Sequence, residues 1–321
     1  MADSPSHDNL DLTVELAPRH PTGLTLRNPI TTAAGTFGYG TEYARLVEIQ
    51  RLGAIWSKGT TARPRRGAPP PRVCETPAGM LNAIGLQNPG VRAVVREKAP
   101  IWATWQVPVI VNIAGETVEE YAAVAAELEG VPGVAGIELN ISCPNVHAGG
   151  MIFGVDPRLA AEVTGAVRMA TSLPLTVKLS PNVTDIRPIA EAVVAAGADS
   201  LSLINTISGL AIDLQTRRPF LGNGTGGLSG PAVKPVALRL VYQVASVVGD
   251  AVPIIGLGGI VSVEDVVEFM MAGATAVAVG AATFARPTAA TELLDGLTAW
   301  MGAQGVRQLG EIRGAALPKP E

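Results

Sequence analysis

The residues best suited to chemistry follow short apolar segments of the sequence. Each segment predicts a buried strand, and at the end of nearly every one stands a lysine, asparagine or glycine. A single lysine or asparagine there is more often a cap or turn residue, but two lysines and three asparagines at strand ends exceed what capping requires. The residues are Lys58, Asn112, Asn140, Lys178, Asn205, Gly258, Gly259 and Gly280. We predict that they converge on one mouth of the protein.

Glycines late in the chain indicate a bound phosphate. Gly258 ends the predicted seventh strand and is followed by Gly259, and Gly280 ends the eighth. This is the usual phosphate site of barrel enzymes, because backbone N–H groups without a side chain can approach the anion. A Gly-x-Gly-x-x-Gly pattern also occurs at 222–227. No predicted strand precedes that pattern and no helix follows it directly, so we reject a dinucleotide site there.

Cys143 is the candidate reactive side chain. An intracellular cysteine more often packs as a small hydrophobic residue, but Cys143 comes just past a predicted strand and lies near Asn140 and Asn145 in the sequence. That position favours a catalytic role, whereas Cys74 has no such neighbours and is assigned none. The histidines do not cluster, and no zinc-site spacing or Gly-x-Ser-x-Gly motif is present. Metal catalysis and serine hydrolysis therefore lose support.

The composition is typical of α/β proteins. Of the 321 residues, 47% are hydrophobic and 16% are charged, as expected for buried parallel strands covered by helices. The net charge of −4 provides no basic field for nucleic acid. No apolar segment is long enough to span a membrane, and the first residues lack a signal-peptide pattern. We expect a cytoplasmic protein with one domain over residues 1–321, of which residues 1–10 are disordered.

The alternation of apolar segments with helical periods predicts a (β/α)8 TIM barrel. A doubly wound open sheet has the same alternation, but a count of eight strands favours the closed barrel. Segments 12–16 and 24–30 predict an N-terminal β-hairpin at the barrel floor, and long βα loops at 58–88 and 205–231 are expected over the active site. The predicted barrel strands are 30–33, 54–58, 107–113, 136–141, 175–180, 200–205, 252–258 and 276–280.

Several longer motifs resemble those of the dihydroorotate dehydrogenases, specifically the class 1B form that uses NAD through a partner subunit. The motifs are LNAIGLQNPG, NISCPN, VKLSPNVTDI, LINT, GGLSGPA-x-KP and IIGLGGI, and the matches run from about Gly23 to Pro287. The resemblance implies an FMN-dependent enzyme that oxidises dihydroorotate to orotate in pyrimidine biosynthesis. It also implies catalytic roles for Cys143, Lys58 and Lys178.

The resemblance assigns two sets of binding residues. Those implied to contact FMN are Ala34, Gly35, Lys58, Gly59, Asn112, Asn140, Lys178, Ile204, Gly230, Gly258, Gly259, Gly280 and Ala281. Those implied to bind the substrate are Lys58, Asn82, Ala83, Ile84, Gly85, Leu86, Asn140, Asn145, Asn205 and Thr206. The sequence departs from the family at Ala34, where serine is frequent, and at Ala281, where threonine is usual. Loss of the hydroxyl at 281 is expected to weaken FMN binding by about 0.5–1.5 kcal/mol.

The resemblance also implies which group carries out each step of the reaction. Cys143 takes the C5 proton of the substrate, FMN takes the C6 hydride, and Lys178 stabilises the negative charge that develops on the flavin. Two cysteines cannot ligate an iron–sulfur cluster, which needs four thiolates. We therefore expect an electron-transfer subunit carrying FAD and an iron–sulfur cluster, which passes electrons to NAD. The expected assembly is a heterotetramer with a homodimeric core.

Three alternatives stay open at this point. A dihydropyrimidine dehydrogenase-like flavoprotein has a similar barrel, although Asn145 after Ser-Cys-Pro fits the orotate enzymes better. The chain could instead be a catalytically silent flavin-binding scaffold, or an apo barrel that binds a sugar phosphate through its late glycines. The presence of flavin, and its reduction by dihydroorotate rather than dihydrouracil, distinguish these classes.

Overall fold

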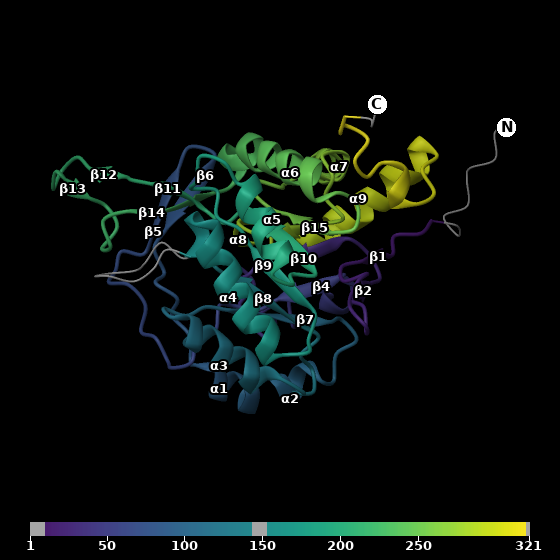
Figure 1. The fold of residues 1–321 in the computed structure, drawn as a ribbon. Helices are drawn as coiled ribbons and strands as arrows, with labels where there is room; N and C mark the ends of the chain where they lie inside the picture. The colour runs from purple at the N-terminus through teal and green to yellow at the C-terminus, as the bar shows by residue number, and fades with distance from the viewer. Residues whose placement is uncertain (1–9, 143–152, 319–321) are drawn as a thin grey trace.

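Parallel strands close into a barrel at the centre of the molecule (Figure 1). The computed structural model describes residues 10–142 and 153–318, and within them eight strands pair in chain order until the last pairs with the first. The strands are β3 (Ile30–Thr32), β4 (Ala54–Trp56), β7 (Val109–Ile113), β8 (Gly136–Asn140), β9 (Leu175–Lys178), β10 (Ser200–Leu203), β15 (Ile254–Gly256) and β16 (Ala276–Val279). Each lies within one predicted segment, so the barrel is confirmed and the open sheet was the wrong alternative.

The barrel strands are buried on both faces. Every residue of β7, β8, β9 and β10 is buried, which explains why these segments are continuously apolar instead of alternating. Polar residues nevertheless occur in them, among them Asn112, Glu138, Asn140 and Lys178. Because a buried polar group is costly unless it is paired, these side chains mark an interior that must provide partners or bind a ligand.

Helices cover the outside of the barrel. They are α1 (Val91–Glu97), α2 (Ala99–Trp102), α3 (Val118–Leu128), α4 (Pro157–Ala170), α5 (Arg187–Ala195), α6 (Lys234–Val248), α7 (Val263–Met271), α8 (Ala282–Ala285) and α9 (Ala289–Gln304), with 3-10 turns η2 (Ile49–Arg51), η3 (Phe153–Val155), η4 (Pro231–Val233) and η5 (Leu309–Glu311). Neighbouring helices from α3 to α7 pack against one another, and α7 packs on α9. Side chains define where they begin: Thr117 accepts a hydrogen bond from the backbone of Glu120 at α3, and Ser262 forms a capping box with Asp265 at α7.

The predicted N-terminal hairpin is present at the amino end of the barrel. Strands β1 (Val14–Glu15) and β2 (Thr25–Leu26) pair antiparallel, and Leu16 and Leu26 are fully buried. The guanidinium of Arg19 donates to the carbonyl of Ala198, just before β10 begins. The hairpin therefore closes the barrel floor, as predicted. The expectation of disorder over residues 1–10 concerns a segment of which only Leu10 lies within the described residues.

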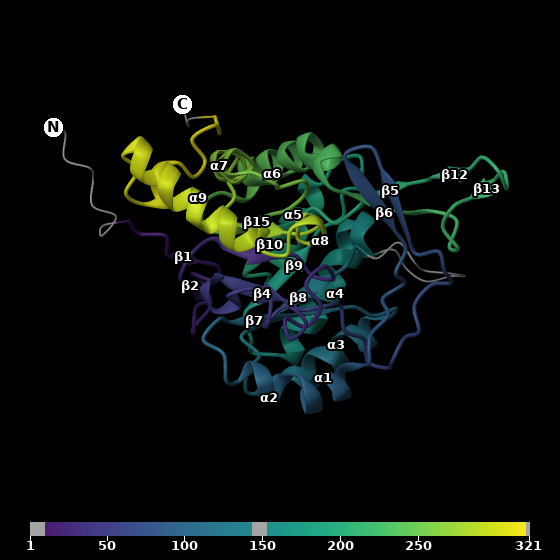
Figure 2. The same ribbon diagram turned by 180° about the vertical axis from the view of Figure 1, so that it is seen from behind.

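The two long βα connections contain strands that the sequence analysis did not predict. Strands β5 (Val73–Thr76), β6 (Gly79–Asn82), β11 (Ile207–Gly209) and β14 (Gly226–Ser229) form an antiparallel sheet in the order β11-β14-β6-β5. A two-stranded arm of β12 (Ile212–Asp213) and β13 (Arg218–Pro219) extends from this sheet, at the end of the molecule opposite β1 and β2 (Figures 1 and 2). The two connections thus meet as one wall over the barrel mouth.

None of the helices within 10–142 and 153–318 combines the length and the hydrophobicity needed to cross a bilayer.

Candidate active site

A cavity of about 550 Å³ opens where the barrel strands end. Its walls are the carboxyl ends of the strands and the sheet formed by the long connections. The cavity brings together every described residue to which the sequence analysis gave a binding or catalytic role: Ala34, Gly35, Lys58, Gly59, Asn82, Ala83, Ile84, Gly85, Leu86, Asn112, Asn140, Lys178, Ile204, Asn205, Thr206, Gly230, Gly258, Gly259, Gly280 and Ala281. Cys143 and Asn145, the remaining predicted residues, lie outside the described residues.

Two lysines contribute positive charge to the cavity. Lys178, the last residue of β9, is only 4% exposed, and its ammonium makes no hydrogen bond or ion pair with any residue that the structure describes. Lys58 follows β4, and burial lowers the pKa of its ammonium, with Arg72 acting in the same direction and Glu42 in the opposite one. A buried ammonium such as that of Lys178, with which no described residue pairs, requires an electron-rich ligand. The cavity is therefore suited to an anionic or carbonyl-bearing molecule.

A buried carboxylate orients the Asn112 amide. Asn112 on β7 donates from Nδ2 to Oε2 of Glu138 on β8 over 2.5 Å, and Ser202 on β10 donates from Oγ to Oε1 over 2.6 Å. This leaves Oδ1 of Asn112 directed toward Gly59, where a Cβ would meet it at 3.0 Å. Asn112 thus offers an acceptor to the cavity. Sequence reasoning missed Glu138, because it stands in the middle of β8, whereas the candidate residues were sought at strand ends.

Ser142 holds two of the predicted asparagines. Its backbone N–H and its hydroxyl donate to Oδ1 of Asn140, over 3.2 and 2.7 Å, and the hydroxyl accepts from Nδ2 of Asn205 over 2.5 Å. Oδ1 of Asn205 in turn accepts from the backbone N–H of Thr206 over 2.9 Å. No described residue accepts from Nδ2 of Asn140, so this amide is a donor available to a ligand. The serine next to the predicted cysteine was not singled out in the sequence.

The sheet over the mouth forms the substrate side of the cavity. Gly227 on β14 pairs with Asn82 on β6, and Nδ2 of Asn82 donates to the carbonyl of Gly227 over 3.3 Å. A Cβ at Gly227 would overlap the side chain of Thr206, so only glycine permits this approach. The sheet therefore places Asn82 and the segment after it opposite the asparagines at the barrel strand ends.

The opposite end of the cavity is lined by backbone. Gly258 has φ of +132° and Gly259 has φ of +79°, and Gly230, the residue after β14, has φ of +100°. A Cβ at Gly258 would meet the Cβ of Ala237 at 2.7 Å, and one at Gly259 would meet the Cβ of Lys234 at 2.8 Å. The glycines thus allow this loop to pack directly on α6, and their backbone lines this end of the cavity, which suits a phosphate group.

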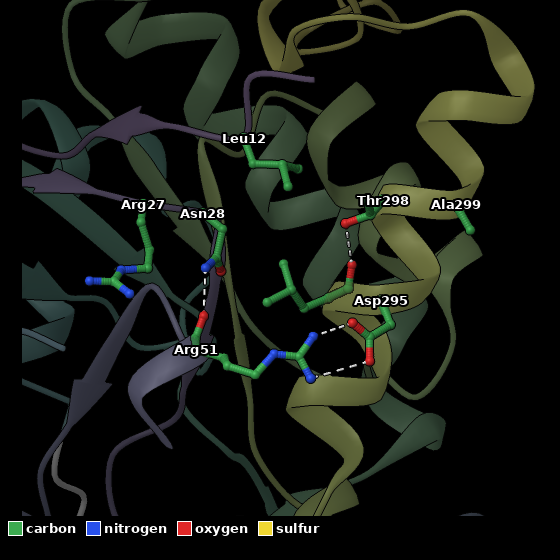
Figure 3. A pocket seen from close by; sticks show the side chains of 8 residues that line it. Leu12, Arg27, Asn28, Arg51, Asp295, Thr298 and Ala299 are labelled. Carbon is green, nitrogen blue, oxygen red and sulfur yellow. Dashed lines mark hydrogen bonds and ion pairs between the residues drawn. The ribbon is translucent and has the colours of Figure 1, made fainter. Parts of the chain in front are cut away.

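A smaller hollow of about 360 Å³ lies at the amino end of the barrel (Figure 3). It is bordered by Arg51, which pairs with Asp295 of α9 and with Glu48, and by Asn28, which donates to the backbone carbonyl of Arg51 over 2.8 Å. These charged groups satisfy one another. The hollow lies between the barrel floor and α9, and none of the residues with a predicted function lines it.

The described residues outside the cavity add no metal centre. Within 10–142 and 153–318, no three or more histidine, cysteine, aspartate or glutamate side chains are grouped so that they could hold a metal ion. Cys74 lies on β5 as a free thiol, and it does not line the cavity.

The fold and the cavity define a (β/α)8-barrel protein with its ligand site at the carboxyl ends of the strands. Residues 18–301 match the family model described as dihydroorotate dehydrogenase. The chain belongs to the dihydroorotate dehydrogenase family, as the motifs of the sequence predicted.

Curated relatives agree over nearly the whole chain. A protein of Geotalea daltonii, named dihydroorotate dehydrogenase B (NAD(+)), catalytic subunit, is 56% identical over 305 residues, which are 95% of this chain and 98% of that protein. Relatives of the same name from Geotalea uraniireducens and Desulforudis audaxviator are 55% and 56% identical over 307 and 294 residues. They cover 96% and 92% of this chain, and 98% and 95% of their own lengths.

Proposed function

We propose that the chain is the catalytic subunit of an NAD-linked dihydroorotate dehydrogenase, which oxidises dihydroorotate to orotate in pyrimidine biosynthesis. The names of relatives that align over almost the full chain support this activity. The observation that carries the proposal is one cavity at the strand ends, which gathers two lysines, five asparagines and a glycine-lined end. These groups match a planar, anionic pyrimidine next to a phosphate-bearing cofactor. We also propose that residues 1–321 form one domain, in the cytoplasm.

We propose FMN as the cofactor of this cavity. Lys178 is buried, and no described residue pairs with its ammonium; together with the wall of glycines, it fits a molecule with electron-rich ring atoms and a phosphate group. When bound, FMN supplies the acceptor for the hydride that leaves C6 of the substrate. The residues that would hold it are Ala34, Gly35, Lys58, Gly59, Asn112, Asn140, Lys178, Ile204, Gly230, Gly258, Gly259, Gly280 and Ala281.

Proton transfer and charge stabilisation are proposed for two different side chains. Cys143 takes the proton from C5 of the substrate, so that the C5–C6 double bond forms as the hydride leaves C6. Lys178 stabilises negative charge in the cavity, where low water content strengthens its field. Ser142, directly before the cysteine, fixes Asn140 and Asn205, and thereby orients the amides that bind the substrate.

The substrate is recognised by amides on both sides of the cavity. Asn82 comes from the sheet over the mouth, while Asn140 and Asn205 come from the barrel strand ends. The remaining proposed contacts are Lys58, Ala83, Ile84, Gly85, Leu86, Asn145 and Thr206. An analogue without the carboxylate leaves buried donors unpaired, so the site selects orotate-like over uracil-like rings.

We propose that electrons leave through a partner subunit. The relatives are named catalytic subunits, and the two cysteines of this chain are too few for an iron–sulfur cluster. The partner carries FAD and the cluster and reduces NAD, in a heterotetramer built on a homodimer of this chain. Rapid turnover of the isolated chain with NAD would contradict this assignment.

The test of the function uses the purified full-length chain. Its visible spectrum is recorded, dihydroorotate is added without oxygen, and bleaching of the flavin band is followed. Rapid bleaching by dihydroorotate and none by dihydrouracil is the expected result. Bleaching by dihydrouracil alone would assign the chain to dihydropyrimidine chemistry, and a flavin that neither compound reduces would make it a silent scaffold.

A further inference from the structure

Lys234 forms an ion-pair cluster just outside the glycine-lined end of the cavity. It is the first residue of α6, and its Nζ lies 2.5 Å from Oδ1 of Asp265 and 2.7 Å from Oε2 of Glu268, both on α7. The side chain of Asp265 is only 8% exposed. Lys234 does not line the cavity, and the proposed reaction gives it no role. The cluster nevertheless joins the two helices that flank the loop after β15.

Asp265 connects this ammonium to the loop itself. Its Oδ2 accepts hydrogen bonds from the backbone N–H groups of Val261 and Ser262, over 2.8 and 2.9 Å. Burial alone would raise the pKa of Asp265, but the hydrogen bonds from Lys234 and from these backbone groups outweigh it and lower the pKa. The pKa of Lys234 is raised by its bonds to the two carboxylates. The pair is therefore ionised at neutral pH and fixes the position of residues 261 and 262.

The backbone of Lys234 supports the loop from the other side. A Cβ at Gly259 would meet the Cβ and the N of Lys234 at 2.8 and 3.0 Å, and the carbonyl oxygen of Gly230 at 2.9 Å. Gly259 thus lies directly against the start of α6. The segment Gly258–Val261, which lines the cavity, is held between this contact and the Asp265 carboxylate.

We infer that the Lys234–Asp265 ion pair positions the Gly258–Val261 backbone for the phosphate group of the cofactor, which makes Lys234 a positioning residue specific for that phosphate. The inference rests on the proposed FMN site. Two effects act together: the pair holds the loop in shape, and the ammonium offsets carboxylate charge that would otherwise repel a phosphate dianion. Both effects concern the phosphate and leave the flavin ring contacts, on other strands, unchanged.

A purely structural tie between α6 and α7 has a different consequence. Loss of such a tie would loosen the entire end of the barrel and weaken binding of any flavin. Riboflavin has the same ring system as FMN and lacks the phosphate. The ratio of the two dissociation constants therefore separates positioning of the phosphate loop from general support of the fold.

The experiment uses the full-length chain after removal of its flavin. Dissociation constants for FMN and for riboflavin are measured by quenching of flavin fluorescence, for wild type and for Lys234→Met, Lys234→Gln and Lys234→Arg. We expect Lys234→Met to weaken FMN binding about tenfold, as for one weakened hydrogen bond to a charged group, with riboflavin binding within about twofold of wild type. Lys234→Gln should be intermediate, and Lys234→Arg should recover most of the FMN affinity. Should the methionine variant not fold, the glutamine and arginine variants carry the comparison.

A matched ion pair provides the control. Arg168 pairs with Asp199 at 3.1 Å, with side chains 23% and 12% exposed, and Asp199 also accepts from the backbone N–H of Leu175 at the amino end of the barrel. Arg168→Met should lower stability and leave the FMN-to-riboflavin ratio unchanged.

The outcomes are distinguishable. Equal losses for FMN and riboflavin in Lys234→Met, or no loss for either, would overturn the inference while the cofactor assignment stands. If the wild-type chain binds neither flavin, the proposed function fails and the inference fails with it.

Discussion

Asn112 and Glu138 form a buried hydrogen bond, Nδ2 to Oε2 over 2.5 Å, at the base of the candidate active site. The other oxygen of the same carboxylate accepts from Ser202, so one side chain joins strands β7, β8 and β10 inside the barrel. Glu138 is 1% exposed. Glu138 does not line the cavity, but its carboxylate fixes the direction of the Asn112 amide, which does.

Removal of this acceptor should be costly. Glu138→Met leaves two buried donors unpaired and should lower the free energy of unfolding by about 2–4 kcal/mol. Glu138→Gln should cost only about 1 kcal/mol, because the amide oxygen still accepts from Asn112 and the Ser202 hydroxyl can accept instead of donate. Urea denaturation measures both variants, with Glu162→Met on the exposed side of α4 as a control that should stay within about 0.5 kcal/mol. A methionine variant as stable as wild type would show that the carboxylate is dispensable.

The two cysteines offer a matched test of proton transfer. Cys143→Ala should slow reduction of the flavin by dihydroorotate by about 10²-fold or more, because general base catalysis is lost, while the flavin spectrum stays unchanged. Cys74→Ala, which alters a thiol outside the cavity, should reduce at the wild-type rate. Stopped-flow spectroscopy without oxygen measures both. In wild type the rate should rise with pH, since an ordinary thiol ionises near pH 8.5 and only the thiolate accepts a proton. A pH-independent rate, or a fast alanine variant, would assign the base elsewhere.

The Lys58 ammonium should lower the free energy of unfolding, although the substrate site needs its charge. Burial lowers the pKa of its ammonium in the folded state, so the charged form is disfavoured there relative to the unfolded chain. Lys58→Met should therefore be more stable than wild type at pH 7. The difference should shrink as the pH rises through the folded pKa toward the ordinary value of 10.5, where the unfolded chain also loses its proton. Urea denaturation of the flavin-free protein at several pH values measures this, and a difference that grows with pH would contradict the sign. The same variant should lose affinity for orotate.

The sequence predicted the barrel and missed the sheet above it, and both outcomes have a physical cause. The barrel strands are buried on both faces, so their apolar residues are continuous and easy to recognise, as in Val109–Ile113. Strand Gly226–Ser229 is half-buried throughout and strand Val73–Thr76 alternates only weakly, so neither has a distinct periodicity. Their pairing depends on two connections, far apart in the sequence, meeting over the mouth.

The same distinction applies to the site. Residues at strand ends, such as Lys178 and Asn112, were predictable because the barrel topology brings all strand ends to one mouth. The residues that orient these side chains or the nearby backbone could not be predicted in this way. Glu138 and Lys234 contact partners on other strands or helices, and only the closed barrel reveals those distances. Ser142 stands beside Cys143 in a recognised motif, yet its bonds to two asparagines depend on how the chain turns after β8.

The close approach of β14 to the barrel provides a test of the sheet as the substrate wall. A Cβ at Gly227 would overlap Thr206, so Gly227→Ala should push β14 away from Thr206. Asn82, which pairs with Gly227, should shift with it. We expect orotate to bind about tenfold or more weakly, with a stability loss of about 1–3 kcal/mol from overpacking. Gly209→Ala is the control in the same sheet, because its Cβ would meet Cδ2 of Leu81 at 2.9 Å and otherwise only the Cβ of Leu228 at an ordinary contact distance of 3.9 Å. Orotate titration followed by the flavin spectrum measures both variants. Equal orotate affinities for the two alanine variants would show that the sheet does not contact the substrate. A loss of affinity in Gly227→Ala alone would place the substrate against β14.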